Sequence, residues 1–156
     1  MTLNVGDQAP DFTLSDQNGE PVTLSKLRGK PVVVYFYPKA DTPGCTTQAC
    51  GVRDHHADYA KFDATVLGIS PDAVTPISKF AQKYDLGFPL LSDEDHSVAE
   101  AYGVWVEKSM YGKKFMGNER TTFVVGADGA LTHIFQKVKP AEHDALVLEA
   151  LTKQPA

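Results

Sequence analysis

Apolar residues fall along the chain in short runs whose spacing alternates between the periods of strands and helices. Residues 31–37 are continuously apolar and rich in β-branched and aromatic side chains, which is typical of a strand covered on both faces. Residues 43–62 carry apolar side chains at helical spacing, and residues 65–69 form a second strand-like run. This order predicts a right-handed parallel unit with 31–37 as a central strand.

Three further stretches have apolar positions at helical spacing and predict helices over residues 73–85, 93–102 and 140–153. Between the first two lies a short apolar segment, 88–91. Its Pro89 favours an edge or the start of a strand over a strand centre, because proline cannot donate a hydrogen bond to a neighbouring strand.

Turn signals predict two antiparallel hairpins, one near each end of the chain. Asn18-Gly19 lies between short alternating segments, and Asp128-Gly129 lies between two runs rich in strand-forming residues. The four strands are expected over residues 12–14, 22–24, 121–125 and 130–135. Together with the parallel unit, they predict an α/β thioredoxin-like fold: a central mixed sheet flanked by helices, with an N-terminal β-hairpin extension.

Length and composition are those of one globular domain. The chain has 156 residues, of which 42% are hydrophobic and 22% charged, and these values exclude a disordered or fibrous protein. A chain of this length buries roughly 70% of the surface that its unfolded form exposes. A single domain over residues 1–156 is therefore expected to fold without metals or disulfide bonds.

Charge and hydropathy exclude several kinds of partner. The 15 basic and 20 acidic residues give a formal net charge of −5, and the basic residues are scattered, so neither nucleic acid nor an anionic membrane is expected as a partner. Residues 1–7 lack a leader pattern, and no apolar run approaches the roughly 18 residues of a membrane span. A cytoplasmic location is therefore expected. In that reducing compartment a structural disulfide is not expected, which leaves reactive chemistry or coincidence to explain the two cysteines.

The stretch before the predicted helix at 43 is the most informative, because α/β sheets commonly bind ligands where a strand ends. Thr42 suits an N-cap and Pro43 the first helical position, which places Cys45 at the third. Free amide groups and the helix dipole stabilise an anion there, so the nucleophilic thiolate is favoured. The alternative is a small apolar residue packed in the core, since free cysteine is among the most buried residue types.

Cys50 follows Cys45 by five positions on the same predicted helix. That spacing separates the two Cα atoms by about 8.6 Å, whereas a disulfide tolerates at most about 7 Å. A bond between them therefore requires this part of the helix to unwind. Gly51, next to Cys50, weakens the helix at that place.

Pro38, Thr42 and Cys45 form the P-x-x-x-T-x-x-C pattern of the peroxiredoxin active site, and residues 41–50 resemble the bacterioferritin comigratory protein (PrxQ) subfamily. The resemblance extends over nearly the whole chain, through residues 6–12, 88–93 and 119–123. It implies a thioredoxin-fold thiol peroxidase that reduces hydrogen peroxide and organic hydroperoxides with no cofactor or metal. It also implies a monomer that is recycled by thioredoxin, and whether glutaredoxin can replace thioredoxin is left open by the sequence.

In this resemblance Cys45 is the peroxidatic cysteine and Cys50 the resolving cysteine. The Thr42 hydroxyl can bond to the sulfur or the substrate, and Arg120 can supply a fixed cation to the thiolate and the leaving oxygen. Pro38 would shield the sulfur from water. Taken singly, each has a plainer interpretation: Thr42 as an N-cap only, Arg120 as a solvated residue at a strand end, and Pro38 as a strand terminator.

Two other functions are compatible with a thioredoxin-like fold. A disulfide reductase is disfavoured because the chain has no C-x-x-C pair, the spacing at which two thiols meet without unwinding a helix. A binding module without catalysis is disfavoured because Pro38, Thr42, Cys45 and Arg120 occur together.

The histidines do not have the spacing of a zinc site. His55 and His56 are adjacent on a predicted helix and are expected to be packed or at its surface. His96, His133 and His143 are isolated in the sequence and are expected to be exposed.

A second group of residues has no clear place in the chemistry. Asp93 begins an acidic run, 93–95, which is expected to complement a helix dipole. Aromatic and methionine side chains between the last two predicted helices are expected to pack in the core or against loops, with an apolar mouth for organic peroxides as the alternative. They are Trp105, Tyr111, Phe115 and Met116.

Overall fold

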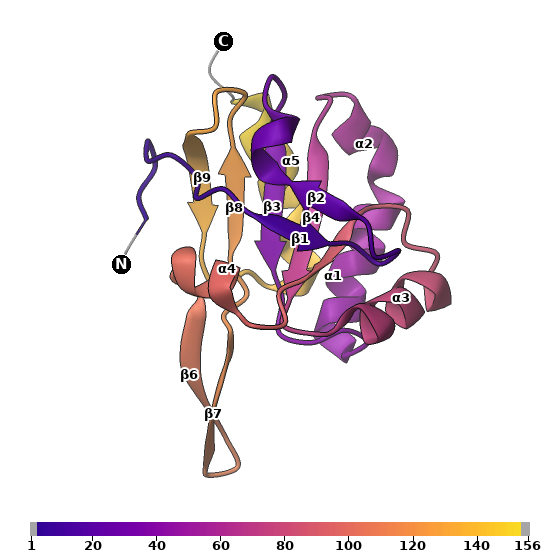
Figure 1. Ribbon diagram of the computed structural model, residues 1–156. Helices are drawn as coiled ribbons and strands as arrows, with labels where there is room; N and C mark the ends of the chain where they lie inside the picture. The colour runs from indigo at the N-terminus through magenta and orange to yellow at the C-terminus, as the bar shows by residue number, and fades with distance from the viewer. Residues whose placement is uncertain (1–2, 154–156) are drawn as a thin grey trace.

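A seven-stranded mixed sheet in the order β2-β1-β5-β4-β3-β8-β9 runs through the centre of the computed structural model, which describes residues 3–153 (Figure 1). Strand β3 (Val32–Phe36) pairs in parallel with β4 (Thr65–Ser70), and β4 with β5 (Leu90–Ser92). The remaining strands pair antiparallel with their neighbours. They are β1 (Thr13–Ser15), β2 (Pro21–Thr23), β8 (Thr122–Val125) and β9 (Leu131–Phe135).

Strand β3 is central, as its continuous apolar run predicts. All five of its residues are buried. Because side chains alternate along a strand, Val33 and Tyr35 enter one apolar cluster while Val34 and Phe36 enter the other. The end of β3 is therefore fixed by packing on both faces of the sheet.

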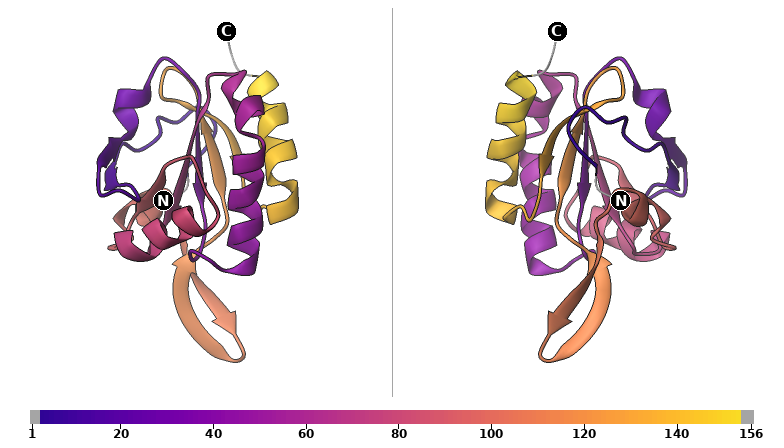
Figure 2. Two further views of the ribbon diagram at one scale, coloured as in Figure 1. Left: turned by 90° about the vertical axis from the view of Figure 1, so that its right-hand side faces the viewer. Right: turned by 90° about the vertical axis from the view of Figure 1, so that its left-hand side faces the viewer.

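Helices cover both faces of the sheet (Figure 2). Helices α1 (Pro43–Asp54), α3 (Val74–Lys83) and α5 (His143–Thr152) pack side chains into the cluster that contains Val33 and Tyr35, and α4 (Ser97–Ala101) packs into the cluster that contains Val34 and Phe36. This arrangement confirms the predicted layout of a mixed sheet flanked by helices. The shorter elements are η1 (Leu24–Leu27), α2 (His56–Ala60) and η2 (Pro140–Glu142).

The predicted N-terminal hairpin is confirmed and joins the main sheet. Strands β1 and β2 pair in antiparallel register, and Ser15 of β1 lies opposite Ser92 of β5. Strand β5 is therefore inside the sheet, and Pro89 directly precedes its first residue, which is the strand start that proline allows.

The predicted helix over 43–62 is wrong in one respect, because it is interrupted at His55. The His55 side chain bonds to the Gly51 carbonyl through Nδ1 at 2.9 Å, and the backbone amide of His55 donates to the same oxygen at 3.0 Å. The chain resumes as α2, in which His56 is exposed and Tyr59 is buried.

The helix predicted over 93–102 is shorter and covers only Ser97–Ala101. His96 has a left-handed backbone with φ of 52°, which separates the acidic run from the helix. The Asp93 carboxylate accepts hydrogen bonds from the amides of Val98 and Ala99 at 3.1 and 2.8 Å. Asp93 therefore complements the helix start as expected, but from outside the helix.

A β-hairpin that the sequence did not indicate projects from the body of the protein (Figure 1). It consists of β6 (Trp105–Met110) and β7 (Lys113–Asn118), joined at Tyr111 and Gly112, which both have positive φ. Tyr111 is 97% exposed, and Phe115 and Met116 are also exposed. Tyr111, Phe115 and Met116 therefore do not pack in the core, whereas Trp105 packs against the cluster of Val34 and Phe36, as expected, and stacks on His96 with ring centroids 4.2 Å apart. Within residues 3–153, no helix has the length and apolar character to cross a membrane.

Candidate active site

The loop between β3 and α1 is held in one conformation by side chains from other elements. The Ala40 amide donates to the Asp72 carboxylate at 2.7 Å. Asp41 has a left-handed backbone with φ of 60°, and its carboxylate accepts hydrogen bonds from Lys83 and from the Tyr84 hydroxyl, each at 3.0 Å. The start of α1 is thus tied to α3 and to the loop after β4.

Cys45 is the third residue of α1 and only 2% exposed. Thr42 occupies the N-cap position as predicted, but its hydroxyl does not cap the helix. It turns back and donates to the Lys39 carbonyl at 2.9 Å. The amide groups of the first turn are therefore not occupied by a capping side chain and are available to an anion.

Arg120 lies in the link between β7 and β8 and reaches the start of α1. Its Nη2 donates to the Cys45 sulfur at 3.5 Å, and its Nη1 donates to Oε1 of Gln48 at 2.6 Å. The backbone of this link is fixed, since Val138 donates to the Arg120 carbonyl and Phe36 to the Thr121 carbonyl, each at 2.9 Å. Arg120 is therefore a half-buried cation held beside a buried thiol, not a solvated residue at a strand end.

Gln48 is a site residue that the sequence reasoning missed. It is fully buried, although glutamine is usually exposed, and its amide oxygen fixes the orientation of the Arg120 guanidinium. The available signal was its spacing, because residues three apart on a helix share a face and Gln48 follows Cys45 by three.

Gly44 permits the close approach of Arg120 to the helix. A side-chain carbon at Gly44 would lie 3.1 Å from Nη2 of Arg120 and 3.4 Å from Cγ of Pro140. A larger residue would therefore push the guanidinium away from Cys45. Pro38 is half-buried in the loop that precedes this turn.

Cys50 lies on the same uninterrupted helix as Cys45, and both thiols are free. Cys50 is partly exposed, whereas Cys45 is buried. The structure thus brings Cys45 and Arg120 together and keeps Cys50 apart by the geometry of an intact helix.

His143 is buried, which corrects the expectation that it is exposed; His96 and His133 are also partly buried. The Nε2 atom of His143 lies 3.0 Å from the Thr122 hydroxyl, and the centroid of the His143 ring lies 5.3 Å from that of Tyr35. Burial, with a smaller contribution from the charge of Arg120, lowers the pKa of His143 to about 4. His143 is therefore neutral near pH 7, and Arg120 has no charged histidine behind it.

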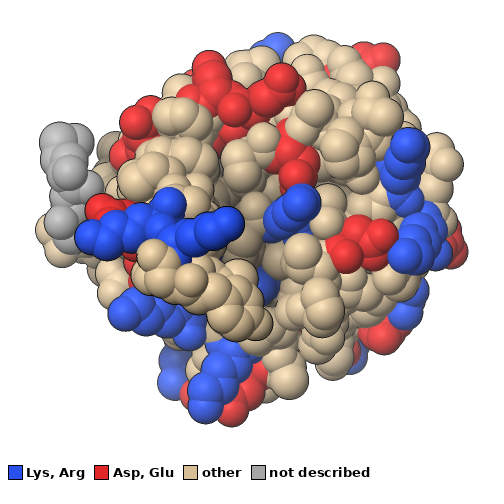
Figure 3. All heavy atoms as spheres, turned by 90° about the horizontal axis from the view of Figure 1, so that it is seen from below, with Lys and Arg blue, Asp and Glu red and all other residues tan. Residues whose placement is uncertain are grey.

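Lys108 of β6 adds a second cation near the site. Its side chain runs over Gly117, with its Cδ 3.6 Å from where a side-chain carbon there would be. Burial and then the charge of Arg120 hold the pKa of Lys108 below its usual range. At the end of the molecule where the hairpin projects, groups of basic and acidic side chains lie beside each other (Figure 3).

Comparison with known proteins gives the same family at the level of sequence and structure. The AhpC/TSA family matches residues 5–134. The chain is 51% identical over 149 residues to "Peroxiredoxin Bcp" of Escherichia coli strain K12, covering 96% of each protein. A solved structure of a PrxQ mutant from Xylella fastidiosa has a TM-score of 0.92 at 32% identity and covers 98% of both chains.

A third relative is the bacterioferritin comigratory protein of Xanthomonas campestris, whose solved structures are described with its alkyl peroxide reduction activity. Its TM-score is 0.86 at 39% identity, and the match covers 91% of this chain and 90% of that one. These likenesses confirm the predicted thioredoxin-like fold. The chain therefore belongs to the AhpC/TSA family and, within it, to the Bcp/PrxQ peroxiredoxins.

Proposed function

We propose that this protein is a thiol peroxidase that reduces hydrogen peroxide and organic hydroperoxides at Cys45. The observation that carries the proposal is the contact of Arg120 with the sulfur of Cys45 at an uncapped helix start. The thiolate attacks one peroxide oxygen, the O–O bond breaks, and the departing oxygen takes up a proton to leave as water or an alcohol. Cys45 is left as a sulfenic acid.

Arg120 stabilises both the thiolate and the negative charge on the leaving oxygen. The Thr42 hydroxyl donates to Lys39, so its oxygen remains able to accept a hydrogen bond from the O–H of the hydroperoxide. Pro38 shields the sulfur from water, in keeping with its half-buried position in the same loop. The alkyl peroxide activity described for the Xanthomonas campestris relative supports organic hydroperoxides as substrates.

Replacement of Arg120 by lysine tests the role of the guanidinium. Lysine keeps the charge but cannot bond at once to Cys45 and Gln48, because it lacks the planar fork. We expect Arg120→Lys to lower the rate of peroxide reduction by about 100-fold, the loss typical of a removed transition-state donor. The rate of Cys45 oxidation should be measured by stopped flow, with circular dichroism as the control for folding. Parent-like kinetics would assign Arg120 a structural role only.

In the second step, Cys50 resolves the sulfenic acid. The Cys50 sulfur attacks the Cys45 sulfur, the S–O bond breaks, and the hydroxyl leaves as water after taking up a proton. The two sulfurs can meet only if α1 unwinds between them, since an intact helix holds their Cα atoms about 8.6 Å apart.

Oxidation should therefore unfold part of α1, and amide exchange should detect it. In the reduced protein we expect residues 45–53 to be protected, and in the oxidised protein to exchange quickly, because the opened turn is a unit of low local stability. Strands β3 and β8 should stay protected in both forms. Equal protection of α1 in the two forms, with the disulfide confirmed by mass, would show that the bond forms without unwinding.

We propose thioredoxin as the reductant of the disulfide, with glutaredoxin as a second candidate, and a monomer working in the cytoplasm. The resemblance to the PrxQ subfamily supports the reductant and the monomer. The test is peroxide-dependent loss of NADPH in a mixture with thioredoxin and thioredoxin reductase. Reduction of insulin without peroxide would instead identify a disulfide reductase, and inactivity in both assays would identify a binding module.

A further inference from the structure

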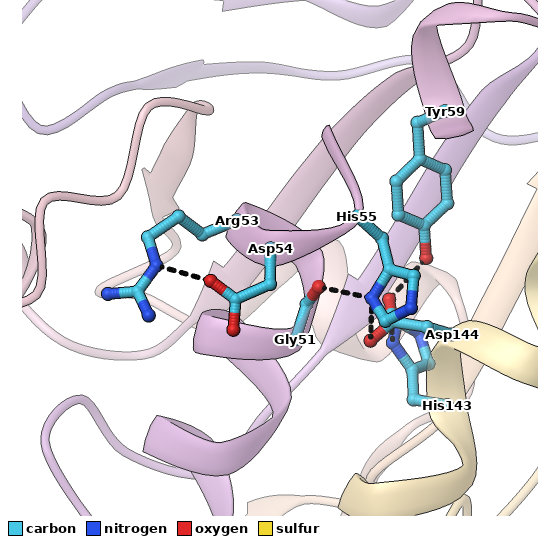
Figure 4. A network of polar contacts seen from close by, with 7 residues as sticks. All are labelled: Gly51, Arg53, Asp54, His55, Tyr59, His143 and Asp144. Carbon is cyan, nitrogen blue, oxygen red and sulfur yellow. Dashed lines mark hydrogen bonds and ion pairs between the residues drawn. The ribbon is translucent and has the colours of Figure 1, made fainter. Parts of the chain in front are cut away.

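Asp144 lies at the start of α5 and reaches towards the end of α1 (Figure 4). Its Oδ1 accepts a hydrogen bond from the Tyr59 hydroxyl at 2.5 Å, and its Oδ2 lies 3.5 Å from Nδ1 of His55. The Asp144 side chain is 11% exposed and its bond to Tyr59 is buried, whereas the His55 side chain is 44% exposed. A buried carboxylate thus connects α5 to the segment that follows Cys50.

Gly51, which directly follows Cys50, is where this carboxylate meets α1. A side-chain carbon at Gly51 would overlap with Oδ2 of Asp144, so only glycine leaves room for the carboxylate. The Gly51 carbonyl is in turn bonded to Nδ1 of His55 at 2.9 Å. The Asp144 carboxylate therefore packs closely against Gly51 and also reaches it through His55, whose ring bonds to the Gly51 carbonyl.

Helix α5 is a firm support for this contact. Val147, Ala150 and Leu151 are buried and belong to the apolar cluster that also contains Cys45 and Ala49 of α1. Cys50 has no such anchor of its own, because it is partly exposed. The restraint on Cys50 thus comes through its neighbour, Gly51.

We propose that Asp144 is a positioning residue for disulfide formation: it holds Gly51 in the helix and thereby limits how readily Cys50 leaves the helix to reach Cys45. This inference rests on the proposed chemistry of the two cysteines. Asp144 does not contact the reacting sulfurs in this role. It controls the resolving step through the stability of the closed helix.

The hydrogen bond from Tyr59 and the charge interaction with His55 stabilise the Asp144 carboxylate in its buried position. Burial raises the pKa of Asp144, while the Tyr59 hydroxyl and His55 act in the opposite direction. The bond to the Gly51 carbonyl raises the pKa of His55, and the charge of Asp144 adds to it. Removing the carboxylate would leave the Tyr59 hydroxyl without its acceptor in the closed state, and such a loss destabilises a buried group.

The first test compares two carboxylates of the same helix. Asp144→Ala should convert the sulfenic acid to the disulfide about tenfold faster than the parent, as expected for loss of a hydrogen bond to a charged group. The rate of the first oxidation should not change. Glu149→Ala removes an exposed carboxylate of α5 and should leave both rates unchanged. Rapid quenching, thiol alkylation and mass spectrometry give the two rates separately.

A conservative variant separates this role from a general effect on folding. Asp144→Asn retains an oxygen that can accept the Tyr59 hydrogen bond. Its rate of disulfide formation should therefore be closer to that of the parent than to that of Asp144→Ala. Amide exchange of the reduced protein supplies a second measurement that needs no peroxide. Residues 45–53 should exchange faster in Asp144→Ala than in the parent, while β3 remains protected.

Gly51→Ala provides a test of opposite sign. Alanine favours a helix over glycine, so helix propensity alone predicts slower opening and slower disulfide formation. In the parent background the new methyl group displaces the Asp144 carboxylate. The loss of this contact should cancel or reverse the stabilisation of the helix by alanine. In the Asp144→Ala background there is space for the methyl group, and Gly51→Ala should slow the resolving step.

The outcomes distinguish this inference from the proposed function. If the parent forms no disulfide with peroxide, the proposed function and this inference both fail. If the parent forms the disulfide and Asp144→Ala forms it at the same rate with unchanged exchange of residues 45–53, the proposed function stands and the role of Asp144 is refuted. Additive effects of Gly51→Ala and Asp144→Ala would also refute the contact between them.

Discussion

Cys45→Ser should reduce peroxide turnover to the uncatalysed background. A hydroxyl at this position is not ionised near pH 7, so the helix start and Arg120 have no thiolate to stabilise. Cys50 cannot take over, because it lies more than a full turn further along α1 and away from the guanidinium. The NADPH-coupled assay with excess thioredoxin measures the loss.

Serine is slightly smaller than cysteine and replaces it in the core, so the experiment needs a control that shows the variant is folded. Thermal unfolding followed by circular dichroism should give a transition close to that of the parent. A folded Cys45→Ser protein that keeps more than about a tenth of the parent rate would contradict the assignment of the nucleophile.

Cys50→Ser should separate the two steps of the cycle. Cys45 and Arg120 are unchanged in this variant, so the first oxidation should proceed at the parent rate. Without a resolving thiol the sulfenic acid persists and meets further peroxide, which oxidises it irreversibly to sulfinic acid. Activity should therefore decay within a few turnovers, whereas the parent survives many.

Mass spectrometry of the intact Cys50→Ser protein follows this course. One equivalent of peroxide should add one oxygen atom, and a large excess should add a second. A variant that withstands excess peroxide as well as the parent does would show that Cys50 has no protective role.

The fold could be predicted where a local pattern and the tertiary packing agree. The continuous apolar run of β3 and the N-terminal sequence of α1 each determine their element almost alone. The β6–β7 hairpin could not be predicted, because its strands lack a regular apolar alternation and its turn is Tyr111-Gly112, whereas Asn-Gly is the common signal. The break at His55 depends on a side chain that bonds to the Gly51 carbonyl, which no helical period reveals.

The site was predictable to the extent that its residues are near in sequence. The places of Thr42 and Cys45 follow from the residue preferences at the N-terminus of a helix. The role of Arg120 is predicted by the resemblance to the peroxiredoxins. The contact between Arg120 and Gln48 joins residues 72 positions apart, and that between Tyr59 and Asp144 joins residues 85 apart. Such pairs result from the packing of β8 and α5 against the helices, so they become visible only in the folded chain.

The central claim is that peroxide converts Cys45 and Cys50 into an intramolecular disulfide. Cleavage after lysine and arginine yields peptide 40–53, which contains both cysteines of the chain. After one equivalent of peroxide, without reducing agent, this peptide should be lighter by two hydrogen atoms and should no longer react with a thiol reagent. A peptide of unchanged mass with two reactive thiols, or one that retains an added oxygen while Cys50 stays free, would contradict the account.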